Sequence, residues 1–252
     1  TLALEGPQKH RPDDALRADL RVVSAQKIGG VVHVDTGAEL NIPAGTTVFG
    51  HEFGTVVVKP GGKIYATGTQ AEPIVFTSSQ DPGNRFPGDW GGIVILGNAT
   101  VNKTAPNIEG GIIEDSLYGV GPECDEGDPS YPDCDNDSSG VFTYVRLEYP
   151  GYRFADGNEI NGLTMGGVGR GTELHHVQVS YSWDDSFEWF GGTVDAKYLV
   201  AFGGTDDEFD TDFGYRGRKQ FLFGLRDADY WDTDATNGFE SDNDDPATEQ
   251  TP

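Results

Sequence analysis

The chain has 252 residues, and 42 acidic side chains against 17 lysines and arginines give it a formal net charge of −25. A field of this sign repels nucleic acid and anionic lipid, which excludes both as partners. No stretch approaches the roughly 18 consecutive apolar residues of a membrane-spanning helix, so we expect no membrane insertion. The 14 Phe, 10 Tyr and 4 Trp residues exclude a disordered acidic tail.

The first 27 residues are polar, and prolines at positions 7 and 12 oppose a continuous helix. We expect residues 1–27 to be a poorly ordered arm or, alternatively, a cap that covers the edge of the first coil. Residues 28–252 are expected to form one domain.

Short strands separated by turns dominate the next part of the chain. Apolar and polar residues alternate with period two from Val31 to Val58, and turns containing Gly or Pro interrupt the pattern. The Asn-Gly or Asp-Gly turns typical of hairpins are absent there, so parallel coils explain the strands better. The 36 glycines and the hydrophobic share of only 36% fit the narrow core of a β-helix.

Residues 104–139 form a long insertion rich in Gly, Asp and Pro. Within it Asp133, Asp135 and Asp137 alternate before the turn at Gly140, and oxygen ligands at every second position of a turning loop commonly wrap Ca²⁺. The alternative is a solvated acidic loop. The spacing does not fit an EF-hand.

The two cysteines, Cys124 and Cys134, lie close together in this insertion. In an exported protein we expect them to form a disulfide. A bridge across so short a loop stabilises by roughly 2–3 kcal/mol in the chain-entropy view. It would also pin the acidic loop and lower the entropic cost of binding an ion.

The most regular stretch runs from Asn158 to Asp212, where short apolar runs alternate with the acidic-aromatic cassettes DDSFE and DDEFD. The phenylalanines of the two cassettes, Phe187 and Phe209, lie 22 residues apart. A fixed period of this length marks a solenoid. A looser echo, NGFE at Asn237–Glu240, requires an insertion in its coil. The sequence therefore predicts an all-β parallel β-helix.

If the two cassettes stack, their carboxylates fall beside one another on one outer face, about 4.8 Å apart. Like charges this close either bind a proton or share a cation. We expect Ca²⁺ as the cofactor. The expected ligands in the cassettes are Asp185, Glu188, Asp207 and Asp210. The alternative is that these carboxylates accept hydrogen bonds from backbone N–H groups of turns.

Other motifs favour structural roles. His175 and His176 are adjacent on an expected strand, so their imidazoles should face opposite sides and not bind one ion together. The glycine-rich stretch Gly166–Gly171 lacks the βαβ context of a nucleotide loop and is expected to be a turn.

No pattern assigns a catalytic residue, and the question of an enzyme stays open. The available bases are Arg146, Arg153, Arg170, Arg216 and Arg218. The available acids are Asp184, Asp185, Glu188, Asp207 and Asp210. The net charge opposes a polyanionic substrate. A neutral glycan would need an exposed row of aromatic side chains, for which the sequence offers Trp90, Tyr181, Trp183 and Trp189.

Several motifs in order carry a resemblance over most of Val31–Asn243. They are GDWGGIVILGNA, YVRLEYPG, NEINGLTMGGVG, HVQVSYSWDDSFEWFGGTVDAKYLVAFG, DDEFDTDFGY and NGFESDN. The chain resembles a family of secreted bacterial β-helix proteins with no settled activity. The resemblance implies a right-handed parallel β-helix and export to the cell surface or medium. Such proteins usually continue beyond NGFESDN, so we expect either a trimmed chain or a covered last coil.

These observations favour a secreted, calcium-supported β-helix that acts as a structural or adhesive protein. Self-association through the β-helix ends or the N-terminal arm, into filaments, is a further expectation because open coil ends expose unpaired backbone. The alternatives are a glycan-active enzyme, either a polysaccharide lyase or a glycoside hydrolase, and a non-catalytic glycan-binding module.

Overall fold

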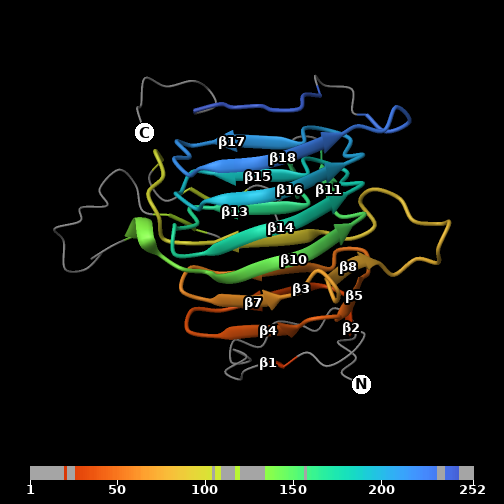
Figure 1. The fold of residues 1–252 in the computed structure, drawn as a ribbon, viewed down its shortest axis with the longest axis horizontal. Coiled ribbons are helices and arrows are strands. Elements are labelled where there is room, and N and C mark those ends of the chain that lie inside the picture. Colours follow the sequence, from red (N-terminus) through yellow and green to blue (C-terminus); the bar gives the residue numbers. More distant parts are fainter. Residues whose placement is uncertain are drawn as a thin grey trace.

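The protein is described here by a computed structural model that places residues 20–21, 26–103, 106–108, 117–119, 134–155, 158–231 and 236–243. Figure 1 shows successive coils piled on one another, with the first coils at one end and the last coils at the other. Across these residues the only helix is the three-residue 3-10 turn η1 (Cys134–Asn136), and no helix could cross a membrane.

Two large sheets form the walls of the stack, and every strand pairing within them is parallel. The six-stranded sheet contains β3 (Val31–Val34), β6 (Thr55–Val58), β9 (Gly92–Leu96), β13 (Leu163–Gly166), β15 (Phe187–Phe190) and β17 (Phe209–Asp212). The ten-stranded sheet contains β1 (Leu20–Arg21), β2 (Gln26–Ile28), β4 (Glu39–Pro43), β5 (Thr47–Gly50), β7 (Lys63–Thr67), β8 (Ile74–Ser78), β10 (Gly140–Glu148), β14 (Glu173–Ser180), β16 (Ala196–Phe202) and β18 (Lys219–Leu225). A short antiparallel pair, β11 (Arg153–Ala155) and β12 (Asn158–Glu159), lies outside both. The predicted all-β parallel β-helix is confirmed.

The ten-stranded sheet turns a corner within each coil. The first part of β10 pairs with β7 and its last part pairs with β8, so one long strand borders two shorter ones. Between the two parts lies Tyr144, whose φ of 51° is in the left-handed region. The equivalent residues of the next coils have the same conformation: His176 (φ 54°), Tyr198 (φ 57°) and Phe221 (φ 62°). A left-handed corner residue is therefore a repeated feature of the wall.

This corner overturns the expectation that His175 and His176 face opposite sides. Strict alternation holds only while the backbone stays extended, and the left-handed His176 interrupts it. Leu174 and Val177 on either side point into the core, while both imidazoles lie on the outer side with their Nδ1 atoms 2.8 Å apart.

The register predicted from the 22-residue period is confirmed. Phe187 and Phe209 are paired residues of β15 and β17, and their rings stack with centroids 5.5 Å apart. Phe239 continues the column at 5.2 Å from Phe209. The Glu240 N–H donates to the Phe209 carbonyl at 3.1 Å, so the NGFE echo forms one more rung beside β17.

The six-stranded sheet is buried on both faces, which the sequence did not predict. Its inner face joins the main core, and its outer face is covered by a second apolar cluster. That cluster comprises Val57, Val94, Leu96, Val101, Ile108, Tyr118, Ile160 and Phe190. The core is therefore two layers deep on this side. As a result, side chains that alternate away from the main core here are not solvated.

Parts of the predicted organisation lie outside the described residues. Within residues 1–27 the structure places β1, which pairs with β4 at one edge of the ten-stranded sheet, and the start of β2. Most of the insertion at residues 104–139 is likewise not described. The arm or cap and the acidic character of the insertion remain predictions.

Candidate metal centre

The last coils place a row of Asx residues just before the six-stranded sheet. Asp185 and Asp207 occupy this row in successive coils, and the Asp207 N–H donates to Asp185 Oδ1 at 2.9 Å. The Asn237 N–H donates in turn to Asp207 Oδ1. One oxygen of each carboxylate therefore holds the backbone of the next coil, which is the alternative that the sequence left open.

A second row of acids follows three positions later. Glu188 and Asp210 are paired residues of β15 and β17, as predicted. They alternate with the core residues Phe187 and Phe209 and so lie on the outer face of the sheet, but this face is covered: Glu188 is 6% exposed and Asp210 is 9% exposed. A hydrogen bond joins the two carboxyl groups, which requires a proton on one of them when no cation is bound. Because the two carboxyl groups are buried, ionising them without a counter-charge is far less favourable than it would be at the surface.

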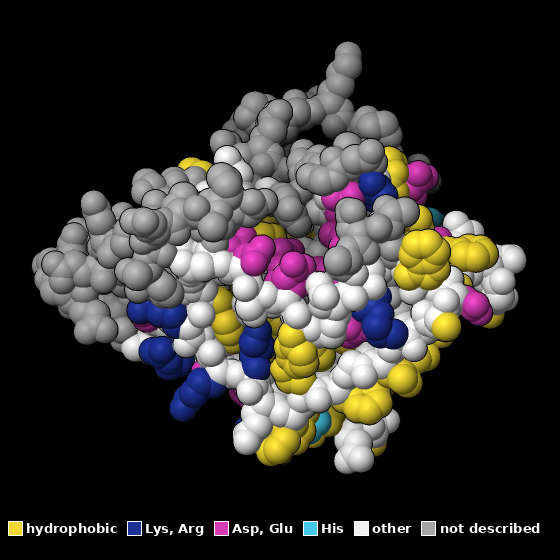
Figure 2. All heavy atoms as spheres, turned by 90° about the horizontal axis from the view of Figure 1, so that it is seen from above, with side chains coloured by type: hydrophobic (Ala, Val, Ile, Leu, Met, Phe, Trp, Pro, Cys, Tyr) yellow, Lys and Arg dark blue, Asp and Glu magenta, His cyan; other side chains and the backbone are white. Residues whose placement is uncertain are grey.

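Three carboxylates converge where the two rows meet. Oxygen atoms of Asp185, Glu188 and Asp210 all lie within 4.8 Å of one another. Asp184 and Asp206 form a neighbouring group of the same dimensions with Asp185, closer to solvent. Figure 2, a view from the end that carries β17 and β18, shows acidic side chains gathered near the middle of that face.

The environment opposes charge on these carboxyls. Burial raises the pKa of Asp185 well above its ordinary value, and the neighbouring Asp184 and Asp210 raise it further. Burial also raises the pKa of Asp210. The hydrogen bond to Asp207, together with burial, raises the pKa of Glu240 in the next rung to about 8. The cluster must therefore hold protons or a cation at neutral pH.

Two neutral oxygens beside the cluster lack a hydrogen-bond partner among the described residues. Asn161 donates its Nδ2 to Glu188, while its own Oδ1 is buried and unpaired. Thr164 is the register partner of Glu188 in β13, and its buried Oγ1 is also unpaired. Buried polar atoms are nearly always satisfied, and these two oxygens are free to contact a ligand or water at the cluster. A set of hard oxygen donors suits Ca²⁺.

Of the four cassette ligands predicted, the structure brings together Asp185, Glu188 and Asp210. Asp207 is not among them, because Asn237 and Glu240 engage its carboxylate. Asn161 and Thr164 were not predicted from the sequence. A signal existed: residues 161–164 read NGLT, which has the same layout as the DSFE and DEFD segments of later coils.

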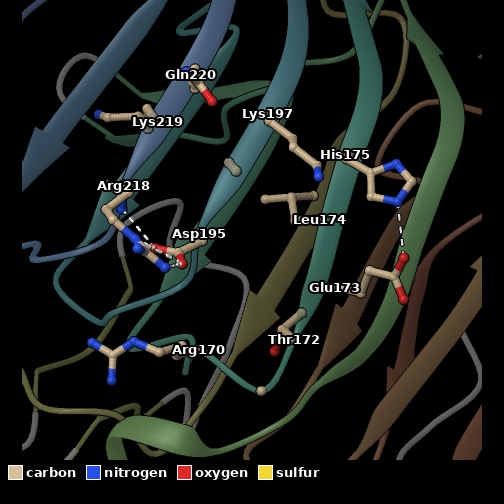
Figure 3. A pocket seen from close by; sticks show the side chains of 12 residues that line it. Arg170, Thr172, Glu173, Leu174, His175, Asp195, Lys197, Arg218, Lys219 and Gln220 are labelled. Carbon is tan, nitrogen blue, oxygen red and sulfur yellow. Dashed lines mark hydrogen bonds and ion pairs between the residues drawn. The ribbon is translucent and has the colours of Figure 1, made fainter.

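An open groove lies elsewhere, where β14, β16 and β18 begin (Figure 3). Its charged lining residues are Arg170, Glu173, Asp195, Lys197, Arg218 and Lys219. Two nitrogens of the Arg218 guanidinium donate hydrogen bonds to the Asp195 carboxylate, and these bonds lower the pKa of Asp195. Glu173 bonds His175 Nε2 at 2.9 Å. Cations outnumber acids in this groove although the chain as a whole is strongly acidic.

Nearly all of the chain matches one known family. Residues 17–252 match the family described as a pectate-lyase-like beta helix domain. The chain belongs to this family. No curated protein and no solved structure matches it. Membership agrees with the observed parallel coils and fits a glycan-related or surface role, although a fold by itself does not define an activity.

In the acidic insertion of this pectate-lyase-like β-helix, two aspartates accept hydrogen bonds from donors of the protein itself. Asp135 accepts from the Thr100 N–H at 3.0 Å and from Arg216 at 2.8 Å, and Asp137 accepts from the Asn98 N–H at 2.9 Å. Asp133 and Cys124 lie outside the described residues. Calcium binding by Asp133, Asp135 and Asp137, and the disulfide between Cys124 and Cys134, therefore remain predictions.

The glycine-rich stretch is a turn, as predicted. It packs so tightly on the insertion that a Cβ at Gly169 would lie 2.4 Å from the Asp137 carbonyl oxygen. The Gly171 N–H donates to the same oxygen at 3.1 Å. This contact explains the glycines without a ligand.

The aromatic residues proposed as a glycan platform do not form a row. Trp90 and Trp189 are fully buried, and the Trp90 indole N–H donates to the Glu148 carbonyl at 2.9 Å. Trp183 and Trp231 are exposed, at 38% and 67%. Alternation around the coil places Trp90 and Trp189 in the core of this pectate-lyase-like β-helix, which the sequence analysis did not anticipate.

Proposed function

We propose that this domain is an exported β-helix whose last coils are stabilised by Ca²⁺, and that it serves as a structural or adhesive surface element. The observation that carries the proposal is the convergence of Asp185, Glu188 and Asp210 inside the fold. Three buried carboxylates within 4.8 Å are strongly unfavourable unless a cation or protons neutralise them.

The donor set favours calcium over other cations. Carboxylates from three positions, an amide oxygen at Asn161 and a hydroxyl at Thr164 are all hard oxygen ligands, which Ca²⁺ accepts in flexible geometry. The ligands come from three successive coils, because β13, β15 and β17 are neighbours in one sheet. A bound ion would therefore join coils that otherwise repel one another. This supports a stabilising role in preference to a catalytic one.

Thermal unfolding with calcium and with chelator tests the proposal. We expect Ca²⁺ to raise the Tm of the parent chain, since a ligand present at 100 times its Kd adds about 2.7 kcal/mol. Asp210→Asn should lose most of this response. Without calcium the variant should be at least as stable as the parent, because it removes a buried charge.

Asp81→Asn is the matched control, because Asp81 is an exposed carboxylate in a loop. It should keep the full calcium response. An identical Tm with calcium and with chelator in the parent chain would refute the calcium site and leave the architecture intact.

Self-association is part of the proposed surface role. At one edge of the ten-stranded sheet, β18 exposes Phe221, Phe223 and Leu225, each at least half exposed. Apolar side chains on an edge strand support pairing between copies. Light scattering over a wide concentration range, with calcium present, should show mass rising with concentration. A constant monomer mass would refute this part.

Glycan binding at the basic groove is the second candidate. The groove supplies Arg170 and Lys197 beside the Arg218–Asp195 pair, and this arrangement favours a ligand carrying acidic groups. A glycan array would detect binding, and a reducing-sugar or unsaturated-product assay would separate an enzyme from a binding module. Binding that persists in Lys197→Gln and Arg170→Gln would count against the groove.

A further inference from the structure

The left-handed corner of β14 carries two adjacent histidines, and no other described coil has such a pair. Each corner places two consecutive residues between two core positions, and the pairs in chain order are Thr143–Tyr144, His175–His176, Lys197–Tyr198 and Gln220–Phe221. Thr143 is buried, and the other seven are partly or fully exposed. The left-handed corner residue brings the two side chains to the same side of the wall. In the β14 coil both of these side chains are histidines.

The geometry of the pair matches a chelate. His175 Nδ1 and His176 Nδ1 lie 2.8 Å apart in a hydrogen bond, whose proton a metal ion would replace. Two metal–nitrogen bonds of about 2.0 Å that meet at a right angle place their nitrogens about 2.8 Å apart, whereas a tetrahedral angle requires about 3.3 Å. Square-planar or tetragonal nitrogen coordination is the preference of Cu²⁺ and Ni²⁺.

Both rings are held in place by their neighbours. Glu173 binds Nε2 of His175 at 2.9 Å, which is how carboxylates commonly orient a metal-binding histidine through its second nitrogen. His176 is stacked between Tyr144, at 4.4 Å, and Tyr198, at 4.5 Å between ring centroids. The ordering cost of a chelate is thus largely met by contacts that exist without metal.

The pair can also be reached from solvent. The His175 side chain is 20% exposed, so a hydrated ion can reach the pair from solvent.

We propose that His175 and His176 form a binding site for a divalent transition metal of the Cu²⁺ type, with Glu173 as a positioning residue and water in the remaining positions. We expect Cu²⁺ to bind most tightly, because the affinity of a nitrogen site for divalent first-row transition metals is highest for Cu²⁺. The site is independent of the carboxylate cluster, which offers only oxygen donors and belongs to the six-stranded sheet.

The test is a Cu²⁺ titration of the full chain in excess Ca²⁺, which occupies the carboxylate cluster if that proposal holds. Electron paramagnetic resonance should show hyperfine coupling to two imidazole nitrogens at the first equivalent of copper. A spectrum with oxygen ligands alone, or with one nitrogen, would overturn the proposal. This readout does not depend on any variant folding correctly.

The neighbouring coils supply matched substitutions. His176→Tyr installs the residue present at Tyr144 and Tyr198 and preserves the stack, and His175→Thr copies Thr143. Each variant should lose the two-nitrogen spectrum and bind Cu²⁺ at least about tenfold more weakly in calorimetry. Glu173→Gln should keep two nitrogens but weaken affinity by about 10- to 100-fold.

His51→Gln is the control, because His51 bonds only Ser79 through Nδ1 at 2.9 Å among the described side chains and lies away from β14. It should bind copper like the parent. Equal copper affinity in His176→Tyr and the parent would assign the metal to other residues and refute the site.

Discussion

Asp212 allows the cost of a buried carboxylate to be measured apart from any calcium ligand. It ends β17 with 8% of its surface exposed and accepts the Phe213 N–H at 2.6 Å. Burial raises its pKa from 3.8 to about 6, against the opposing effects of that hydrogen bond and of Lys103. Asp212→Asn removes the charge and keeps an oxygen that can accept the same hydrogen bond.

The magnitude follows from linkage. A folded pKa about two units above the unfolded value corresponds to about 3 kcal/mol of destabilisation by the ionised group. Solvent still screens part of this carboxylate, so we expect Asp212→Asn to gain roughly 1–2 kcal/mol at pH 7.5.

The direction of the Asp212 pKa shift sets how the stability difference depends on pH. Because the folded pKa is the higher one, the protonated form is compatible with the fold below pH 3.8, and the penalty grows until the pH exceeds about 6. The advantage of the asparagine should therefore vanish near pH 4 and be complete at pH 7.5.

Urea unfolding at a series of pH values, with chelator present, measures this difference. Acids other than Asp212 are common to both chains and largely cancel in the comparison. Asp81→Asn should track the parent at every pH. The reasoning is refuted if Asp212→Asn is no more stable than the parent at pH 7.5, or if its advantage is the same at pH 4.

Two further substitutions probe the stack itself, each with a control in the same chain. Phe187→Ala removes a fully buried ring from the column and should cost about 3–5 kcal/mol in denaturant unfolding, whereas Phe223→Ala, at a 56% exposed position, should cost under about 1 kcal/mol. Gly140→Ala places a Cβ 2.1 Å from the Ile64 carbonyl at a φ of 110° and should cost at least about 2 kcal/mol, whereas Gly30→Ala meets no atom within 4 Å and should leave the Tm nearly unchanged.

The register of the last coils was predictable because a period repeats there without insertions. Once Phe187 is placed over Phe209, the side chains that follow are fixed by alternation, and Glu188 must pair with Asp210. What the sequence could not supply is the burial of that pair. The second apolar cluster on this face includes Ile108 and Tyr118, which come from an insertion without a periodic signal in the sequence.

The orientation of His175 and His176 was predicted wrongly for a different physical reason. Alternation was applied through His176 although its φ is positive, and positive φ is uncommon outside glycine. A signal was present: the segments LHHV, AKYL and KQFL, at equivalent positions of successive coils, each have two consecutive residues that are more exposed than the residues on either side. Aligning successive coils with one another, and not only with an ideal strand, would have revealed the corner.

The two proposed metal sites illustrate how a stacked fold creates chemistry. A coil position that is filled by Thr–Tyr, Lys–Tyr or Gln–Phe elsewhere becomes a nitrogen chelate when two histidines occupy it, with no change of backbone. The carboxylate cluster arises in the same way, since Thr164 in β13 is replaced by Glu188 and Asp210 in the next two coils. Substitution at a repeated position should therefore move a site from coil to coil. Lys197→His with Tyr198→His should create a second two-nitrogen copper site in β16. Failure of that double variant to bind a second ion would show that a free positioning carboxylate such as Glu173 is indispensable, because Arg218 engages Asp195, the equivalent residue beside β16.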